Sequence, residues 1–390
     1  MIDLSQYSVV DDHCHPFLPW REDKEFHQLF NLSTLSIPRI HNENTLLYRK
    51  VVKELSRVLN CPFDFDIVVE RRKKEYSLDP SGYIERLFKD AKISTLILDT
   101  GYPSVEYSGY SIPLEEFRKL VRCSLRRIYR IEPPLFRILQ ADLTFEELLD
   151  RFMESLERAV KTDGYVGLKS VVAYRVGLRN LKQDENSARE AYRRLRGKDF
   201  LRVPSKERDP KSVEDERVLR GYLLCRALEK SIDLDVPLQI HTGIGDSPQI
   251  DVRDSNPLHL HDIIADEDLG KAKLVLVHAG YPYVEEAGYL ANNYPNVYID
   301  LSEMFPFIAT GMRDATFRLL YMAPVTKIMY GSDGYRIPEI FWISALWGKK
   351  AISEALEELV NSEVIDEDYA YKAGSLILSE NAIKLYNISI

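Results

Sequence analysis

Residues 7–19, with the sequence YSVVDDHCHPFLP, place His13 and His15 two positions apart at the end of an apolar, β-branched run. Side chains of a strand alternate between its two faces, so residues i and i+2 point the same way. Two imidazoles on one face, just where the strand stops, are placed to bind the same metal ion. The stretch therefore predicts a strand that carries two metal ligands at its end.

Three further apolar runs end in a residue that can bind a metal. The apolar run in VPLQIHTG is followed by His241, the run in KLVLVHAG by His278, and the run in KIMYGSDG leads to Asp333. Because barrel enzymes carry their sites at the C-terminal ends of the strands, these ends predict one site at the mouth of a barrel. Histidines and an aspartate with one position left open are typical of catalytic zinc, and manganese or iron also fits.

The strand pattern itself indicates the fold. Near-continuous apolar runs that alternate with helical patterns indicate a parallel sheet covered on both faces. Eight such units favour a (β/α)8 TIM barrel of the α/β class over an open sheet. The eight runs are YSVVDDH, KISTLILDT, RRIYRIE, YVGLKSVVAY, VPLQIHT, AKLVLVH, PNVYIDLS and TKIMYGSD.

Two connections are longer than simple loops between strands and helices require. Residues 17–90 contain the helical pattern ENTLLYRKVVKELSRVL, so we expect a helical insertion after the first strand that caps the barrel mouth. Residues 177–232 contain SAREAYRRLRGKDF and SVEDERVLRGYLLCRALEKS, which predict charged helices in an enlarged fourth crossover. A capping-box pattern at Thr144 and Glu147 begins the helix expected between the third and fourth strands. Since no linker or repeat interrupts the pattern, we expect residues 1–390 to form a single domain.

Composition narrows the class of partner. The 390 residues are 45% hydrophobic and 29% charged, as in an ordinary globular protein. A net charge of −9 argues against binding to nucleic acid or anionic membranes. An acidic start that runs directly into a strand predicts no signal peptide, and four cysteines without CxxC spacing fit the reducing cytoplasm. We expect a cytoplasmic protein with a small-molecule substrate, and a homo-oligomer is left open.

The motifs DDHCH, LQIHTG, LVLVHAGYPY and MYGSDG, in this order, resemble the amidohydrolase superfamily. Longer stretches, among them GLKSVVAYRVGL and SENAIKLY, are similar to the amidohydrolase-related (amidohydrolase 2) group that includes the N-terminal half of FluG-type proteins. The resemblance implies that the metal ligands are His13, His15, His241 and Asp333. It also implies that Asp333 takes a proton from the attacking water, and that His278 binds a second metal or polarises the substrate.

Lys169 has two interpretations. Some members of the superfamily carry a carboxylated lysine on the fourth strand, and GLKSVVAY places Lys169 there. A lysine among apolar residues is expected to be buried, so it needs a carboxylate partner, a depressed pKa or carboxylation. Lys169 therefore either contacts or ligates the metal, or forms an ion pair lower in the barrel with the segment of Arg130 and Glu132.

Several residues around the predicted mouth are candidates for binding substrate. Strand alternation would put Arg175 on the same face as Lys169, where it could clamp a substrate carboxylate. Asp246 and Arg253 follow the fifth strand and either contact substrate or stabilise their own loop. Further candidates after the sixth and seventh strands are Tyr281, Asp300 and Glu303, whereas His259 and His261 should begin a helix.

The residues and the resemblance together predict a metal-dependent hydrolase, with zinc as the expected cofactor. We expect it to cleave a C–N amide bond in a small carboxylate-bearing molecule through a metal-activated water, with Asp333 and His278 as catalytic groups. Two alternatives stay open: a non-hydrolytic enzyme on the same scaffold, such as a decarboxylase or a uronate-isomerase-like enzyme, and a non-catalytic metal-dependent ligand-binding or regulatory module. No other feature of the sequence demands a second ion, which favours one metal.

Overall fold

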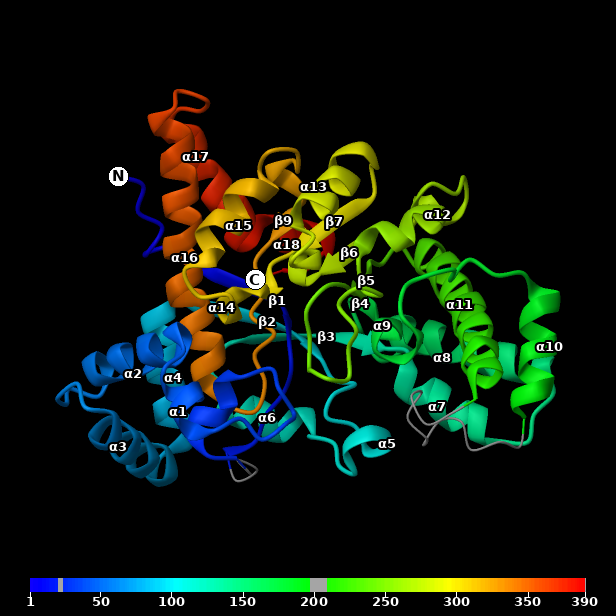
Figure 1. The fold of residues 1–390 in the computed structure, drawn as a ribbon, viewed down its shortest axis with the longest axis horizontal. Coiled ribbons are helices and arrows are strands. Elements are labelled where there is room, and N and C mark those ends of the chain that lie inside the picture. Colours follow the sequence, from blue (N-terminus) through cyan, green and yellow to red (C-terminus); the bar gives the residue numbers. More distant parts are fainter. Residues whose placement is uncertain (20–23, 197–208, 390) are drawn as a thin grey trace.

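The computed structural model describes residues 1–19, 24–196 and 209–389. Its centre is one eight-stranded sheet in the order β1-β2-β3-β4-β5-β6-β7-β9, and all its neighbouring strands are parallel (Figure 1). The strands are β1 Val9–Cys14, β2 Ile93–Asp99, β3 Ser124–Arg130, β4 Gly167–Ser170, β5 Leu238–His241, β6 Leu274–Val277, β7 Val297–Asp300 and β9 Ile328–Met329, with β8 (Ser302–Glu303) as a short bridge after β7.

Backbone hydrogen bonds close the sheet into a barrel. The amide of Asp12 donates to the carbonyl of Tyr330 over 3.1 Å, and the amide of Asp333 donates to the carbonyl of His13 over 2.8 Å. These bonds join the segment after β9 to β1, the first strand. The predicted (β/α)8 barrel is confirmed. Each of its eight strands overlaps one of the apolar runs identified in the sequence, although β1 ends one residue after its run and β3 begins two residues before its run.

The barrel interior is apolar below the strand ends. Val10, Ile97, Ile128, Val275, Val277 and Met329 form a buried cluster with the C-terminal segment. That segment includes α18 (Asn381–Leu385) and is followed by Tyr386, whose buried hydroxyl accepts a hydrogen bond from the side chain of Gln239 over 2.7 Å. The same hydroxyl donates to the carboxylate of Asp12 over 3.3 Å. The C-terminal segment thus closes the barrel beneath the strand that carries the first two histidines.

The connection between β1 and β2 is the expected helical insertion, of which residues 20–23 lie outside the described part. Its helices are η2 Phe26–Phe30, α1 Arg39–Glu43, α2 Leu46–Val58, α3 Phe65–Leu78 and α4 Pro80–Ala91. Ser33 pairs with Ser247 in the loop after β5. Arg72 of α3 forms a buried ion pair, 2.6 Å from Nε to Oε1, with Glu339 at the start of α16 (Pro338–Asn361). The insertion is therefore fixed to loops that leave the C-terminal ends of the strands.

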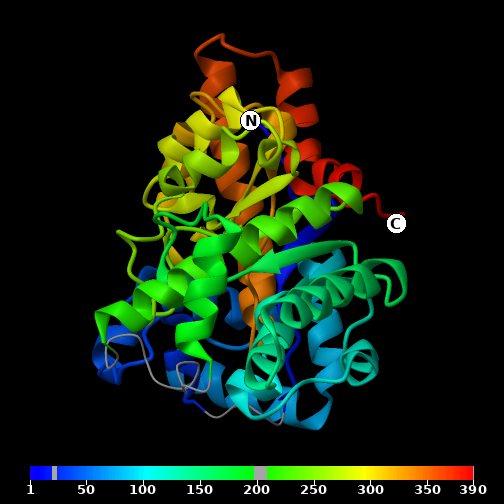
Figure 2. The same ribbon diagram turned by 90° about the vertical axis from the view of Figure 1, so that its right-hand side faces the viewer.

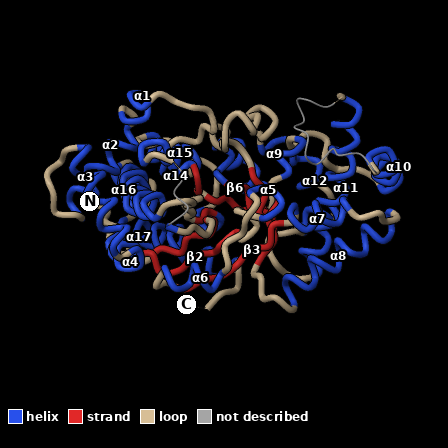
Figure 3. The backbone as a smooth tube through the Cα atoms, turned by 90° about the horizontal axis from the view of Figure 1, so that it is seen from below, coloured by secondary structure: helices blue, strands red, loops and turns tan. Residues whose placement is uncertain are grey.

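The connection between β4 and β5 is the expected enlarged crossover, and residues 197–208 of it, which include the end of the predicted SAREAYRRLRGKDF helix, lie outside the described part. It contains α9 Val172–Val176, α10 Glu185–Leu195 and α11 Pro210–Asp233. Figure 2 shows α10 and α11 in green, and Figure 3 shows the strands at the centre, with α2 and α3 on one side and α10 and α11 on the other. The capping box of Thr144 and Glu147 is present at the start of α8 (Phe145–Lys161).

The end of β4 differs from the expectation. The strand stops at Ser170 because the carboxylate of Glu132 accepts hydrogen bonds from the Ser170 hydroxyl and the Val171 amide, each over 2.8 Å. The chain then turns into α9, so Arg175 lies on a short helix and not on the strand face that carries Lys169. The predicted alternation from Lys169 to Arg175 was wrong for this reason.

The other helices complete the outer layer of the barrel. They are α5 Val105–Ser108, α6 Leu114–Leu120, α7 Glu132–Gln140, α12 His261–Ile264, α13 Val284–Asn293, α14 Met304–Phe307, α15 Gly311–Leu319 and α17 Glu367–Ser375. In the three described ranges, none of the helices has the length and apolar character needed to cross a membrane.

Candidate metal centre

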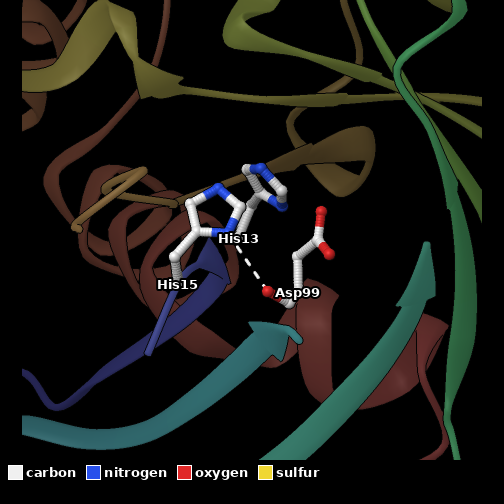
Figure 4. Close-up of side chains that lie close together, drawn as sticks. All are labelled: His13, His15 and Asp99. Atoms are coloured by element: carbon white, nitrogen blue, oxygen red, sulfur yellow. Dashed lines mark hydrogen bonds between the residues drawn. The ribbon is translucent and has the colours of Figure 1, made fainter. Parts of the chain in front are cut away.

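The histidines at the strand ends converge in the barrel mouth. His13 lies in β1 and His15 directly after it, His241 ends β5, and His278 follows β6. All four are buried. Figure 4 shows the first two beside Asp99, which ends β2. The fold therefore brings together the histidines that the sequence analysis identified at the ends of separate strands.

His13 and His15 face one carboxylate. The Nε2 atoms of both rings lie 3.2 Å from Oδ1 of Asp333, which follows β9. Nδ1 of His15 lies 3.1 Å from the carbonyl oxygen of Asp99 (Figure 4), and a carbonyl can only accept, so this nitrogen carries the hydrogen. Nε2 is then the His15 nitrogen that is left to face the carboxylate. This donor set fits a divalent cation, because imidazole nitrogen and carboxylate oxygen are its usual ligands.

His241 and His278 form a second pair. Nε2 of His241 lies 2.8 Å from the carbonyl of Ile244, and Nδ1 of His278 lies 3.0 Å from the carbonyl and from the hydroxyl of Ser302. The two nitrogens that remain, Nδ1 of His241 and Nε2 of His278, are 3.0 Å apart. Burial lowers the pKa of both rings well below its ordinary value, so both are neutral. Two lone pairs therefore face each other.

These tautomers bear on the role expected for His278. Since Nδ1 of His278 carries the hydrogen, its Nε2 accepts and does not donate. The neutral His278 ring is therefore unable to stabilise an oxyanion by a hydrogen bond from Nε2, and it is suited to hold a cation. Among the described residues, three groups of side chains have ligand atoms within 4.8 Å of one another: His13, His15 and Asp99; His13, His278 and Asp333; and His241, His278 and Glu303.

Two of these acidic residues were not assigned to the centre from the sequence. Asp99 was missed, although LILDT ends in an acid at a strand end in the same way as the segment of Asp333. Its carboxylate is bound by Arg130, 2.6 Å from Nη2 to Oδ2. Glu303 was only a further candidate, and the structure places its Oε2 3.5 Å from Nε2 of His278.

The electrostatics of Asp333 follow from its neighbours. Burial works to raise the pKa of this carboxyl, but the contacts with His13 and His15 outweigh burial and hold the pKa well below its usual range. Asp333 is therefore ionised at neutral pH. An ionised carboxylate next to the ring nitrogens can both bind a cation and accept a proton.

Lys169 is in contact with the metal centre. It is fully buried, and its Nζ lies 3.3 Å from Nε2 of His13. Burial lowers its pKa to about 8. The alternative of an ion pair lower in the barrel was wrong, because Glu132 binds the end of β4, Arg130 binds Asp99, and Lys169 has no carboxylate partner in the described ranges.

Arg175 lies on α9, the short helix that follows β4. Its guanidinium carbon lies 4.1 Å from the centroid of the Tyr107 ring, a neighbour that the sequence did not suggest. Its Nε is buried and has no hydrogen-bond partner, and no carboxylate in the described part of the chain pairs with the guanidinium. Burial lowers the pKa of Arg175. Because a half-buried charge without an acidic partner is costly, this side chain is suited to receive an anionic group from a ligand.

The other predicted substrate residues divide into two kinds. Asp246 faces the centre: burial and the repulsion of Asp333 raise its pKa, and its amide donates to the Tyr174 hydroxyl over 2.8 Å. Tyr281 is half-buried after β6, and its carbonyl accepts from the Ile244 amide. Arg253 is not brought to the site, because its exposed side chain binds Asp251 over 2.7 Å.

Comparisons with known proteins agree with the fold and with the chemistry of the donor set. The family model described as amidohydrolase matches residues 141–388. This chain belongs to the amidohydrolase family.

Two relatives match along nearly the whole chain. The chain is 27% identical to the protein fluG of Emericella nidulans over 99% of its own length, and it spans 46% of that relative. The structure of a protein assigned as a metal-dependent hydrolase from Lactobacillus casei superposes with a TM-score of 0.83 at 26% identity, over 99% of this chain and 98% of the other. A uronate isomerase from Thermotoga maritima shares the fold at a TM-score of 0.66 and 16% identity, over 98% and 95% of the two chains.

Proposed function

We propose that this protein is a metal-dependent hydrolase that cleaves a C–N amide bond in a small molecule bearing a carboxylate. The observation that carries the proposal is the convergence of the four imidazoles of His13, His15, His241 and His278 with the ionised Asp333 at the barrel mouth. Membership of the amidohydrolase family supports it. Zinc is the cofactor that we propose, because nitrogen ligands together with carboxylate oxygen suit it.

A divalent cation bound by these residues would lower the pKa of a water molecule and polarise the substrate carbonyl. His13 and His15, with Asp333, are the residues that would hold it. Hydrogen bonds to backbone carbonyls fix the orientation of His15, His241 and His278, so their free nitrogens stay directed at the centre.

Asp333 and Arg175 have separate tasks in this proposal. Asp333 accepts a proton from the attacking water and returns it to the leaving nitrogen. Arg175 binds the carboxylate of the substrate, because its half-buried guanidinium has no acid of its own. Lys169, 3.3 Å from His13, adds positive charge beside the position where the carbonyl oxygen becomes negative.

The test is to offer the zinc-loaded protein four classes of compound: N-acyl amino acids and dipeptides, lactones, uronates, and unsaturated carboxylic acids. We expect hydrolysis of the amides, and we expect the His13→Ala variant to lose bound zinc and activity together. Isomerisation of uronates or release of carbon dioxide without amide cleavage would contradict the proposal in favour of a non-hydrolytic enzyme. Ligands that raise the melting temperature without any turnover would indicate a binding module.

A further inference from the structure

The loop after β5 carries three acids, and the carboxylate of Asp246 differs from the other two. Oδ1 of Asp251 accepts a hydrogen bond from the Arg253 amide over 3.0 Å, and Oδ1 of Asp254 accepts one from Nε of Arg179 over 2.6 Å. In the described part of the chain, no side chain or amide binds the carboxylate of Asp246, which is half-buried. The bonds that stabilise this loop therefore come from the other acids, and Asp246 is left open to a ligand.

The backbone of Asp246 is fixed from two sides. Its amide donates to the Tyr174 hydroxyl over 2.8 Å, and the Tyr174 ring lies 4.6 Å from the ring of His241, measured between centroids. On the other side, the amide of Thr34 in the insertion donates to the carbonyl of Ser247 over 2.8 Å. The helix α9 and the insertion therefore hold Asp246 beside the metal centre.

The carboxylate of Asp246 lies near the centre but outside its set of possible metal ligands. Burial raises its pKa, and so does the charge of Asp333, which lies close enough to repel it. Asp246 nevertheless belongs to none of the three groups of described side chains whose ligand atoms lie within 4.8 Å of one another. It is therefore placed to contact a group of the substrate and not the metal.

The charge of Asp246 has no counterion. Lys24 and Arg336 lower its pKa from a distance, but among the described residues neither of them forms an ion pair with this carboxylate. Hydrogen bonds between charged groups are roughly twice as strong as neutral ones. A cationic group of a ligand would therefore gain more from Asp246 than a hydroxyl or an amide would, and it would offset the repulsion by Asp333.

We propose that Asp246 binds an ammonium group of the substrate, so that the amide which is cleaved carries a free primary amine as well as a carboxylate. The inference rests on the proposed function and deepens it, because Arg175 binds the carboxylate of the same molecule there. It separates two kinds of compound that the proposed function treats alike. A dipeptide carries the ammonium group, whereas an N-acyl amino acid lacks it.

Isosteric pairs of compounds test the inference. Each alanyl dipeptide is compared with the propionyl amino acid in which a hydrogen replaces the ammonium group. The assay is run at pH 7, where an α-amino group with a pKa of about 7.7–8.0 is mostly protonated. We expect kcat/KM of the zinc-loaded full chain to be at least about tenfold higher for the alanyl compound, mainly through KM, because the propionyl compound loses a hydrogen bond between charged groups.

Variants of the loop assign this preference to one side chain. Asp246→Asn should lower the ratio of the two kcat/KM values at least about tenfold, because the amide carries no charge. Asp246→Glu keeps the charge and should restore part of the ratio. Asp254→Asn is the matched control: it makes the same substitution in the same loop, where the carboxylate binds the exposed Arg179, and the ratio should not change.

Two further measurements on Asp246→Asn separate substrate binding from other effects. Bound zinc should equal that of the unaltered protein, since Asp246 lies outside the groups of possible ligands. The metal-free melting temperature should also match, because asparagine keeps the shape of the side chain and the backbone bond to Tyr174.

Three results would overturn the inference: equal kcat/KM for the two members of each pair in the unaltered protein, an unchanged ratio in Asp246→Asn, or loss of zinc from that variant. Hydrolysis of the amides would leave the proposed function standing in each case. If no amide is hydrolysed, calorimetric titration with the same pairs measures binding alone. Tighter binding of the alanyl compounds that Asp246→Asn abolishes would then contradict the proposed function and retain the ammonium site, whereas equal binding would contradict both.

Discussion

The ammonium group of Lys169 lies 3.3 Å from Nε2 of His13, the same nitrogen that faces Asp333 over 3.2 Å. A cation bound beside the carboxylate would therefore compete with the buried Lys169 for Nε2 of His13. The lysine is fully buried on β4, so it is unable to turn away into solvent.

Replacing Lys169 by methionine should strengthen zinc binding at His13 at least about tenfold, because a hydrogen bond from a charged group is worth about 1.5–3 kcal/mol. The pKa of Lys169 is about 8, so the ammonium competes most strongly below that pH. Zinc affinity of the unaltered protein should rise more steeply between pH 7 and 9 than that of the variant. Calorimetric titration at several pH values measures both slopes. A tenfold weaker affinity in Lys169→Met would contradict the prediction.

Replacing Asp333 by asparagine should lower kcat by about 100-fold or more, since general base catalysis contributes typically 10²–10⁴-fold. Binding of a carboxylate-bearing substrate should change little, because Arg175 holds the other end. Steady-state kinetics at saturating zinc provide the measurement, with bound zinc assayed in parallel. If Asp333→Asn has also lost its zinc, a fall in kcat of this size would not support the role of Asp333 as the general base.

Replacing Arg175 by methionine should raise KM for anionic amides at least about tenfold and change kcat less, because the lost contact acts on binding. The metal-free melting temperature should rise, because a half-buried charge without an acidic partner is removed from a functional site. Arg179 offers a matched control: it is exposed and paired with Asp254, so Arg179→Met should leave KM unchanged. A fall in melting temperature together with an unchanged KM would assign Arg175 a structural role.

Replacing Asp99 by asparagine should destabilise the metal-free protein by about 3–5 kcal/mol at pH 7, because Arg130 stays buried without its partner. Burial works to raise the pKa of Asp99, but the charge of Arg130 outweighs it and lowers the pKa to about 2. A carboxyl with a depressed folded-state pKa contributes stability above its unfolded pKa of about 3.9 and loses it as the pH falls towards 2. Roughly 2 kcal/mol of the difference between the two proteins should therefore vanish between pH 4 and pH 2. Urea unfolding across this range measures it, and a constant difference would refute the linkage.

Most of the candidate site could be predicted from the residues at the ends of the predicted strands. His13, His15, His241, His278 and Asp333 were identified because the carboxyl ends of parallel strands in a barrel meet at one mouth. That rule is independent of the loops. Asp99 obeys it as well and was overlooked only because a single aspartate in a run that lacks histidine gives a weak signal.

What the sequence did not reveal depends on contacts between distant segments. β4 ends where it does because Glu132 binds Ser170 and Val171, and the position of Arg175 on a helix follows from that. The pairing of His241 with His278 depends on carbonyls in the following loops, which set the tautomer of each ring. Hydrophobic periodicity predicts which face of a helix or strand is buried, but it does not predict hydrogen bonds between distant segments.

The hydroxyl of Tyr386, bound to Gln239 and Asp12, has a consequence for the biogenesis of the protein. This residue leaves the ribosome after every strand has been synthesised, yet it supports β1 immediately beneath the first histidine. The strand β1, which is synthesised first, therefore gains its contact with Tyr386 only after the rest of the barrel has been made. We expect the nascent chain to hold the metal poorly, and cation capture to be a step of maturation that follows synthesis.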